Sequence, residues 1–295
     1  MRLFVPLAYA VAAQVEALDV REFLQNPTKL AKGLQALHQI VAVDAIICAC
    51  AGGMEAEALG AALTWDSYPP KVVSHPAHHE ALTENFESVI TGSARLSAAL
   101  EATRRLAATV QGEPALAVVM TGPVTFTEQL SGLDFSHIPS EKEANAVAML
   151  EYAGKFLLEL NRQFLLAGAN LIVLLEDYLP QPVLSGSWYS VVTPVVNVAR
   201  FHKALTAVLP LQAATESIPP FIEHLPKGSV LCLPGRCITP EIARRPIGIA
   251  LPNDPISWDL LEGSFPLLTT SGEVPPTTDI GAFRAACERL RGWIA

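Results

Sequence analysis

Several features that would place a chain in a membrane or on a nucleic acid are missing from this one. No stretch of about 18 apolar residues is free of charge and proline, so we expect no membrane-spanning helix. The apolar run in residues 1–6 is too short for a signal peptide. Lysine and arginine number 20 against 29 acidic residues and form no dense stripe. The net charge of −9 therefore argues against nucleic acid or an anionic membrane as the main partner.

The cysteines are few, and their spacing does not suggest a disulfide framework. The chain has five cysteines, and four of them lie in or beside apolar segments: Cys48, Cys50, Cys232 and Cys237. An odd number of buried thiols favours reduced cysteines, and hence a cytoplasmic protein, over a disulfide framework. Because Cys-x-x-Cys spacing is absent, a metal cluster built from these thiols is not favoured.

Short apolar runs alternate with helical patterns along the whole chain. Most runs are continuously apolar, as is typical of strands buried on both faces. No Gly-x-Gly-x-x-Gly follows an early strand, which disfavours the alternative fold, an open doubly wound sheet. With no linker or low-complexity segment, residues 1–295 are predicted to be one α/β domain, a (β/α)8 TIM barrel. The predicted strands are residues 3–8, 45–50, 115–121, 171–176, 208–213, 229–233, 247–251 and 267–270.

Helix start and stop signals fill the gaps between these strands. Asn26 is expected to cap a helix that has Pro27 at its first position and runs to Val41. Ser140 and Glu143 form a capping-box pattern at the start of a helix that Gly168 ends. Further helices are predicted at residues 93–110, 194–207, 240–245 and 279–293. The long segment 65–90 is expected to pass over one face of the barrel.

Four motifs, in their order and spacing, resemble the uroporphyrinogen decarboxylase (URO-D) superfamily. They are the block 44–60, Gly122-Pro123-Val124-Thr125-Phe126, Ala167-Gly168-Ala169 and Gly272-Glu273-Val274-Pro275-Pro276. The resemblance implies a TIM barrel. It also implies one of two activities: decarboxylation of tetrapyrroles, or zinc-dependent methyl transfer with corrinoid proteins.

The residues of the decarboxylase branch are replaced in this chain. The arginines that this branch carries after the first strand are absent from residues 7–14. Ala51, Gln129, Asp177 and Ser271 stand where the resemblance implies Asp, Tyr, Ser and His. Since a substrate with many carboxylates needs several cations, we expect no useful decarboxylation of uroporphyrinogen.

The zinc ligands of the methyltransferase branch are replaced as well. Gln212, Ala214 and Gly272 stand at the three positions where the resemblance implies His, Cys and Cys. None of them supplies the imidazole or thiolate that makes a zinc-bound thiol nucleophilic. We therefore expect no tightly bound cofactor and no stoichiometric zinc, with a corrinoid reaching the site through a partner protein.

Two acids and a phenol end the fourth predicted strand: Glu176, Asp177 and Tyr178. In a TIM barrel such strand ends carry the chemistry, so we expect Glu176 and Asp177 to be catalytic and Tyr178 to bind substrate. If the odd-numbered residues of this strand face the helices, Glu176 faces inward and lines the largest pocket with Glu216 or Glu273. The alternatives are that Asp177 caps a turn and that Glu176 pairs with an arginine.

The remaining candidates also follow strands. Glu216 and Glu273 are predicted to complete the catalytic set, although Glu216 also suits the first turn of a helix. The predicted substrate-binding residues are Tyr178, Arg236, Cys237, Asn253 and Gly122. For Cys237 the alternative, a small buried apolar residue, is favoured. A metal at His75–His79 is not favoured, because the segment lacks metallopeptidase spacing.

The function predicted from the sequence is therefore methyl transfer with a corrinoid or tetrapyrrole-like partner, through an atypical site without zinc. The first alternative is a decarboxylase-type lyase on a different carboxylic acid, with Arg236 as the anchor. The second is a non-catalytic binding or assembly subunit of the same fold. The partners expected are a small-molecule or tetrapyrrole ligand and a corrinoid protein, and a homodimer remains open.

Overall fold

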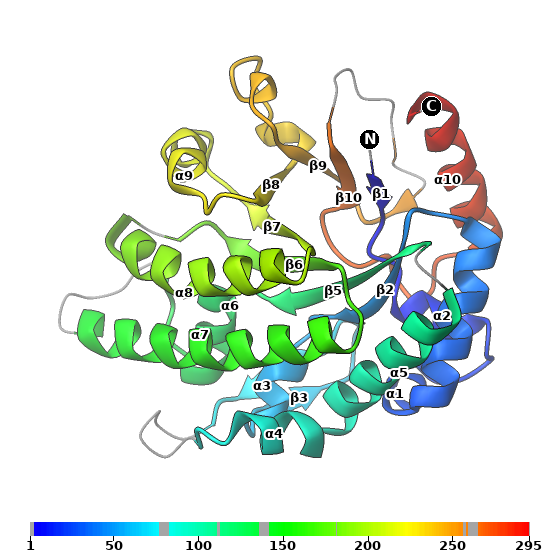
Figure 1. Cartoon of the computed structure of the whole chain (residues 1–295), viewed down its shortest axis with the longest axis horizontal. Helices are drawn as coiled ribbons and strands as arrows, with labels where there is room; N and C mark the ends of the chain where they lie inside the picture. Colours follow the sequence, from blue (N-terminus) through cyan, green and yellow to red (C-terminus); the bar gives the residue numbers. More distant parts are fainter. Residues whose placement is uncertain are drawn as a thin grey trace.

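Eight apolar segments form one parallel sheet that closes almost completely into a barrel in the computed structural model (Figure 1). The structure describes residues 3–76, 83–110, 113–135, 142–180, 182–255, 258 and 265–294. The sheet order is β1-β10-β9-β8-β7-β6-β5-β2, and helices lie outside it. The predicted (β/α)8 TIM barrel is confirmed. Its strands are β1 Leu3–Val5, β2 Ala45–Cys50, β5 Ala115–Thr121, β6 Leu171–Tyr178, β7 Leu205–Gln212, β8 Ser229–Pro234, β9 Gly248–Leu251 and β10 Leu267–Thr270.

The bounds predicted for β2, β5 and β10 are those observed, and the others differ at their ends. The first strand is shorter than predicted because Pro6 has no N–H group with which to continue the ladder. The strand β7 begins at Leu205, earlier than predicted, because Leu205 pairs with Leu171 of β6. Pairing with a neighbouring strand thus sets these ends.

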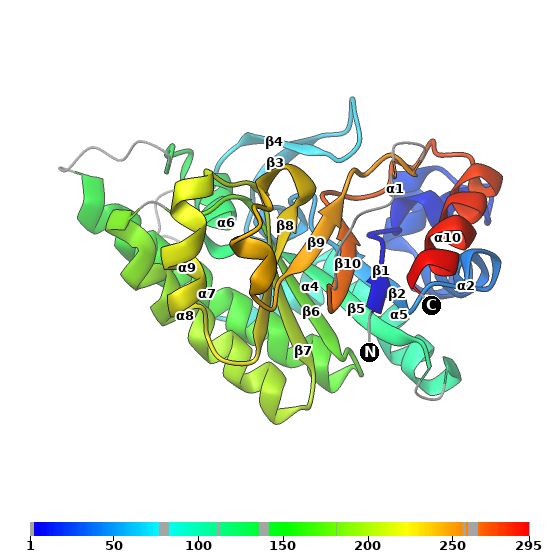
Figure 2. The same cartoon turned by 90° about the horizontal axis from the view of Figure 1, so that it is seen from above.

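A small antiparallel hairpin stands apart from the barrel sheet. It consists of β3 (Ala62–Thr64) and β4 (Lys71–Ser74). Figure 2 shows it at the end of the barrel toward which the parallel strands run. This end carries the loops that follow the strands and is called the mouth below.

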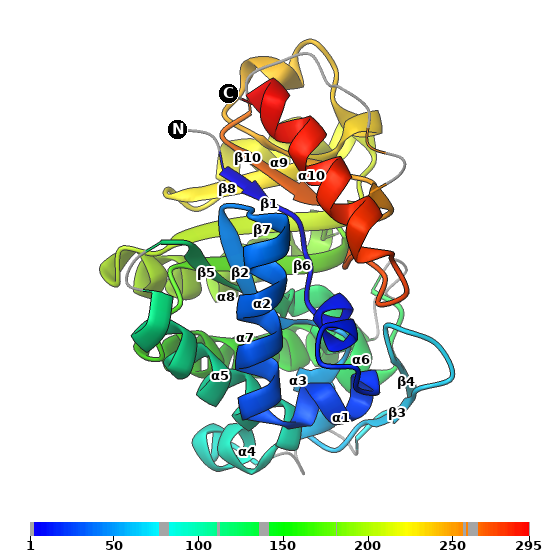
Figure 3. The ribbon, with the colours of Figure 1, turned by 90° about the vertical axis from the view of Figure 1, so that its right-hand side faces the viewer.

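Between β1 and β2 the barrel is closed by the hydrogen bonds of one residue, Asp44, and not by a ladder of strand pairs. The Asp44 carboxylate accepts a hydrogen bond from the Phe4 N–H at 2.7 Å, and the Asp44 N–H donates to the Phe4 carbonyl at 3.1 Å. Figure 3 shows this side of the molecule, where α2 (Pro27–Val41) and α10 (Ile280–Ile294) lie. Because β1 and β2 are not paired with each other, Asp44 is the main polar link between them among the described residues. The gap between these two strands is called the seam below.

The helices follow from local capping and from apolar faces. Asn26 caps α2 as predicted, since its side chain accepts from the N–H groups of Thr28 and Lys29. The remaining α-helices are α1 Val20–Gln25, α3 Met54–Ala58, α4 Phe86–Gly92, α5 Ala94–Val110, α6 Pro123–Ser131, α7 Glu143–Leu166, α8 Pro182–Phe201 and α9 Ile218–His224.

Two helix boundaries differ from the prediction. The helix α7 begins at Glu143, with Lys142 at its N-cap and no side-chain cap. Ser140 of the predicted capping box lies outside the described residues, so that prediction is not tested. The helix α8 contains Pro194 in its interior, although we expected a helix to begin there. Proline has no N–H group for the helix hydrogen bond, and the close packing of α8 against α7 offsets this loss. At this crossing Gly154 of α7 leaves room for Val191 of α8.

Apolar side chains fill the barrel and the layer between sheet and helices. All five cysteines are free and buried, which agrees with the expectation of reduced thiols. None of the helices in the described part of the chain has the length and apolar character needed to cross a membrane.

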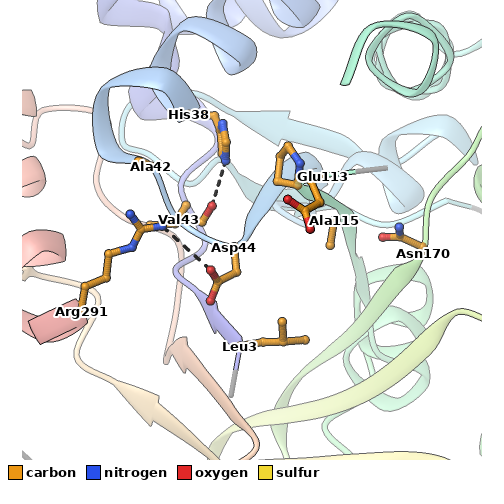
Figure 4. A pocket seen from close by; sticks show the side chains of 10 residues that line it. Leu3, His38, Ala42, Val43, Asp44, Glu113, Ala115, Asn170 and Arg291 are labelled. Atoms are coloured by element: carbon orange, nitrogen blue, oxygen red, sulfur yellow. Dashed lines mark hydrogen bonds and ion pairs between the residues drawn. The ribbon is translucent and has the colours of Figure 1, made fainter. Parts of the chain in front are cut away.

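A pocket of about 560 Å³ opens at the opposite end of the barrel, where the strands begin (Figure 4). Its lining includes Asp44, His38, Glu113, Asn170 and Arg291. Two of the polar lining residues hold backbone groups near the sheet: the His38 ring bonds to the Val43 carbonyl at 2.8 Å, and the Asn170 side chain accepts from the Leu116 N–H at 2.8 Å. At this end of a TIM barrel such groups serve stability.

We predict that Asp44→Ala lowers the free energy of unfolding by about 1–3 kcal/mol, because the Phe4 N–H loses its acceptor at the seam. Asp44→Asn keeps an acceptor and should cost less. Urea unfolding measures both. Arg291→Ala is the control: its guanidinium lies 3.9 Å from Asp44 in a partly exposed pair, which contributes about 0–1 kcal/mol. Equal losses in Asp44→Ala and Arg291→Ala would contradict the role of the seam.

Candidate functional site

The hairpin β3–β4 is attached to the mouth at two points. The Tyr68 hydroxyl donates to the Glu273 carboxylate at 2.6 Å, and His75 Nδ1 lies 2.9 Å from the Gln129 carbonyl. The hairpin part of segment 65–90 thus lies over one end of the barrel, as expected, whereas α4 packs against α5 and α7. His78 and His79 lie outside the described residues, so the prediction about a metal at His75–His79 stays open.

Glu273 follows β10, and its carboxylate lies among hydrogen-bond donors. Besides Tyr68, the Ala10 N–H donates to it at 2.6 Å, and the Cys50 thiol lies close to it. Burial nevertheless raises the pKa of Glu273 to about 7, because desolvation outweighs these donors and the more distant Arg95. As a residue Glu273 is partly exposed, but its carboxyl group is buried among these donors. Glu273 is therefore a buried acid at the mouth whose charge changes near neutral pH.

A second buried carboxylate lies beneath the glycine-rich exit from β2. Glu55 is fully buried and accepts from the Thr121 N–H at 2.8 Å and from the Thr121 hydroxyl at 2.9 Å. Desolvation raises its pKa. Both oxygens thus join the first turn of α3 to the end of β5.

Arg95 is the buried cation of this region. It is 3% exposed and donates to the Gly52 carbonyl and to Glu57, each at 3.2 Å. Its guanidinium also lies 5.1 Å from the centre of the Trp65 ring. These contacts hold the hairpin base and the β2 exit together, and they commit Arg95 to groups of its own chain.

Glu176 faces the helix layer, so its predicted inward orientation is wrong. Its carboxylate accepts from the N–H groups of Val124 and Thr125 in the first turn of α6 and from the Trp188 indole of α8, at 2.8–3.1 Å. Burial, not a neighbouring acid, raises its pKa to about 7. Continuous apolar strands show no difference between their two faces, which is why the sequence could not decide this orientation.

The Gly-Pro motif before α6 is explained by this carboxylate. A Cβ atom at Gly122 would overlap the Glu176 carboxyl carbon. Gly122 itself offers no side chain as a cap, and Glu176 supplies the acceptor from the next strand. Gly122 is therefore explained by packing, and its predicted contact with a substrate is not tested.

Because side chains alternate along a strand, Asp177 lies on the opposite side from Glu176 and is exposed. Desolvation raises its pKa. Its backbone N–H donates to the Thr125 hydroxyl at 2.7 Å. The Tyr178 hydroxyl donates to Glu128, whose carboxylate also accepts from the Phe135 N–H at 2.7 Å. Tyr178 thus fixes the end of α6.

Glu216 lies apart from the other predicted acids. It is exposed at the start of a short 3-10 turn, and it lines a groove of about 480 Å³ between α8 and α9. Glu176 and Glu273 are not among the residues that line this groove. Glu176, Glu216 and Glu273 share no hydrogen-bond partner in the described part of the chain, so the expected single cluster of acids is not formed.

The other predicted binding residues lie around the rim. Arg236 is exposed and donates to the Leu211 carbonyl at 3.0 Å. Cys237 is buried and its thiol donates to the Ala213 carbonyl at 3.6 Å, which fits the alternative of a packed apolar residue. Asn253 donates weakly to the Glu273 carbonyl at 3.5 Å. Asn253 is thus the predicted binding residue that contacts the segment of Glu273.

The residues at the family's zinc positions do not fit a zinc ion. Gln212 and Ala214 are exposed at the end of β7, and Gly272 faces Asn253. Among the described residues, no three His, Cys, Asp or Glu side chains converge in a way that could hold a metal. These residues therefore give no support for a zinc-dependent step.

The residues predicted for the site from the sequence did not include four residues of the mouth: Glu55, Tyr68, Arg95 and Glu128. A signal existed for Arg95, because it falls on the same helical stripe of α5 as the buried Ala98, Ala99 and Ala102. A charged residue on an apolar stripe has to find a buried partner. Tyr68 had no comparable signal, since its partner Glu273 is distant in the sequence.

We predict that Glu176→Ala lowers the free energy of unfolding by about 2–4 kcal/mol, because three donors lose their acceptor inside the fold. Glu176→Gln should also destabilise, since its amide N–H₂ faces donors. Denaturant unfolding measures both. Asp177→Asn is the neighbouring control and should change stability by about 0.5 kcal/mol or less. A stable Glu176→Gln variant that loses ligand binding would instead restore Glu176 to the functional site.

Comparisons with known proteins agree with this fold. The sequence model of uroporphyrinogen decarboxylase (URO-D) matches residues 1–206. A methyltransferase from Methanosarcina mazei is similar in structure, with TM-score 0.70, 15% identity and coverage of 98% of this chain and 94% of that one.

A second similar structure is a B12-independent methionine synthase from Shewanella sp. W3-18-1, in complex with selenomethionine, with TM-score 0.51 and 14% identity. The match covers 94% of this chain and 91% of that one. A search of curated proteins found no match. Because the family model covers well over half of the sequence, the chain belongs to the uroporphyrinogen decarboxylase (URO-D) family.

Proposed function

We propose that this chain transfers a methyl group at the barrel mouth, from a corrinoid or tetrapyrrole-like donor to a small nucleophile such as a thiol. In this proposal Glu273 accepts the proton of the nucleophile. The thiol sulfur gains the methyl group, and the donor keeps the bonding electron pair. The observation that carries the proposal is the Glu273 carboxyl group, which lies at the mouth in a partly exposed residue and has a pKa of about 7.

The hydrogen bonds of Glu273 support this role. A carboxylate has about four acceptor sites, and the Ala10 N–H and the Tyr68 hydroxyl use two of them. A substrate S–H or O–H group can occupy another. A base with a pKa near 7 is ionised over much of the neutral range and still binds a proton well, as general-base catalysis requires.

The activities named for similar structures point in the same direction. One is called a methyltransferase and the other a methionine synthase. Their identity to this chain is too low to carry an activity across by itself, so the argument depends on Glu273. In this proposal Glu273 activates the nucleophile in place of a metal ion, because the described residues offer no set of zinc ligands.

The decarboxylase alternative is less well supported. A substrate with several carboxylates needs several free cations. Arg95 is bound to Gly52, Glu57 and the Trp65 face, and Arg236 is exposed and bonded to a backbone carbonyl. Neither guanidinium is held ready for a substrate carboxylate.

We predict that Glu273→Gln lowers kcat/KM by about 10²–10⁴-fold, since the proton acceptor is lost. The assay uses methylcobalamin and 2-mercaptoethanol, with the methylated thiol measured by mass spectrometry. In the wild type, kcat/KM should rise as pH increases through about 7, because only ionised Glu273 accepts a proton. Tyr68→Phe removes a donor to the anion and should move this rise to higher pH.

Glu216→Gln is the matched control, because it makes the same chemical change at a carboxylate in the groove. It should leave kcat/KM within about threefold of the wild type, on the usual scale of surface effects. If Glu216→Gln abolishes turnover and Glu273→Gln does not, the reaction takes place elsewhere. If the wild type has no activity with any small thiol, the non-catalytic alternative is favoured.

We further predict that chelator treatment leaves the activity unchanged and that elemental analysis finds no stoichiometric zinc. The reason is the donor set: Gln212, Ala214 and Gly272 provide neither thiolate nor imidazole. One tightly bound Zn²⁺ per chain, with activity lost on its removal, would contradict the proposal and direct attention to Cys50 and the segment His75–His79.

A further inference from the structure

The groove that contains Glu216 is not used by the proposed reaction. Its lining residues come from α8, α9 and the segments that follow β6 and β7; Figure 1 shows the places of these elements. Its volume of about 480 Å³ is within the usual range for small-molecule sites, roughly 300–1,000 Å³. The lining includes Leu179 and Pro180 after β6 and the aromatic side chains of α8 and α9.

The aromatic wall is a packed cluster. The Tyr189 ring lies 5.6 Å from Phe221 and 5.8 Å from His224, measured between centroids. Trp188 supports it from behind, at 4.9 Å from Phe221. Such rings are held by their neighbours and offer π-faces that attract cations.

Two polar ring groups of the groove have their hydrogens engaged within the protein. The Tyr189 hydroxyl donates its hydrogen to the Phe221 carbonyl at 3.3 Å. His224 Nδ1 donates to the Pro220 carbonyl at 2.9 Å. The Tyr189 oxygen therefore remains as an acceptor.

The charge of the groove is also one-sided. Glu216 supplies a carboxylate that makes no ion pair with any described residue. No lysine or arginine is among the described residues that line the groove. An anion would find no cationic partner among the described lining residues, and a neutral apolar ligand would leave the Glu216 carboxylate unpaired.

We propose that this groove binds an organic ammonium ion with an apolar body. The charged N–H or N–CH₃ group lies near Glu216 and the aromatic faces, and the apolar body lies against Leu179 and Phe221. This site is independent of the proposed methyl transfer, since Glu273 is not part of it.

The test compares 2-phenylethylammonium with 2-phenylethanol, which has nearly the same shape and no charge. Calorimetry or NMR titration on the full chain should give a Kd at least tenfold lower for the ammonium ion. Glu216→Gln should raise the Kd of the ammonium ion about tenfold and leave that of the alcohol unchanged. Tyr189→Leu should weaken both.

Glu223→Gln is the matched control, because it removes the same charge from α9 outside the groove, where Glu223 pairs with Arg245 at 3.6 Å. It should leave both Kd values unchanged. Equal binding of the two probes overturns the proposal. An equal effect of Glu223→Gln and Glu216→Gln also overturns it, because the net charge of the protein would then explain the preference. Circular dichroism confirms that each variant is folded.

Discussion

The mouth of this barrel depends on carboxylates that accept hydrogen bonds from the backbone of a neighbouring β/α unit. Glu55 holds the end of β5, Glu176 holds the first turn of α6, and Glu273 holds the segment after β1. Backbone N–H groups at strand ends have no partner in the ladder and are costly when buried. The glutamates satisfy them and thereby fix the loops relative to one another.

The same chemistry leads to different roles because the three carboxylates differ in access. Glu55 and Glu176 are fully buried as residues, whereas Glu273 is partly exposed as a residue although its carboxyl group is buried. Desolvation raises the pKa of all three, so a raised pKa alone would select Glu176 as readily as Glu273. The partial exposure of residue 273 is the reason why our proposal uses Glu273.

The architecture could be predicted from the sequence because it depends on local patterns. Continuous apolar runs gave β2, β5 and β10 with their observed bounds, and Asn26-Pro27 gave the start of α2. The site could not be predicted in the same way. The orientation of Glu176 depends on which face of β6 meets the helices, and the partner of Glu273 is a tyrosine on a distant hairpin. Both depend on contacts between segments far apart in the sequence.

The motifs that relate this chain to its family are largely explained by structural requirements. Gly122 leaves space for Glu176, and Glu176 in turn replaces the missing cap of α6. These features preserve the shape of the mouth whatever reaction takes place in it. A chain can therefore keep the family's motifs and barrel while Gln212, Ala214 and Gly272 replace metal ligands. Family membership thus accounts for the fold, and our proposal for the reaction depends on the residues of this chain, Glu273 first among them.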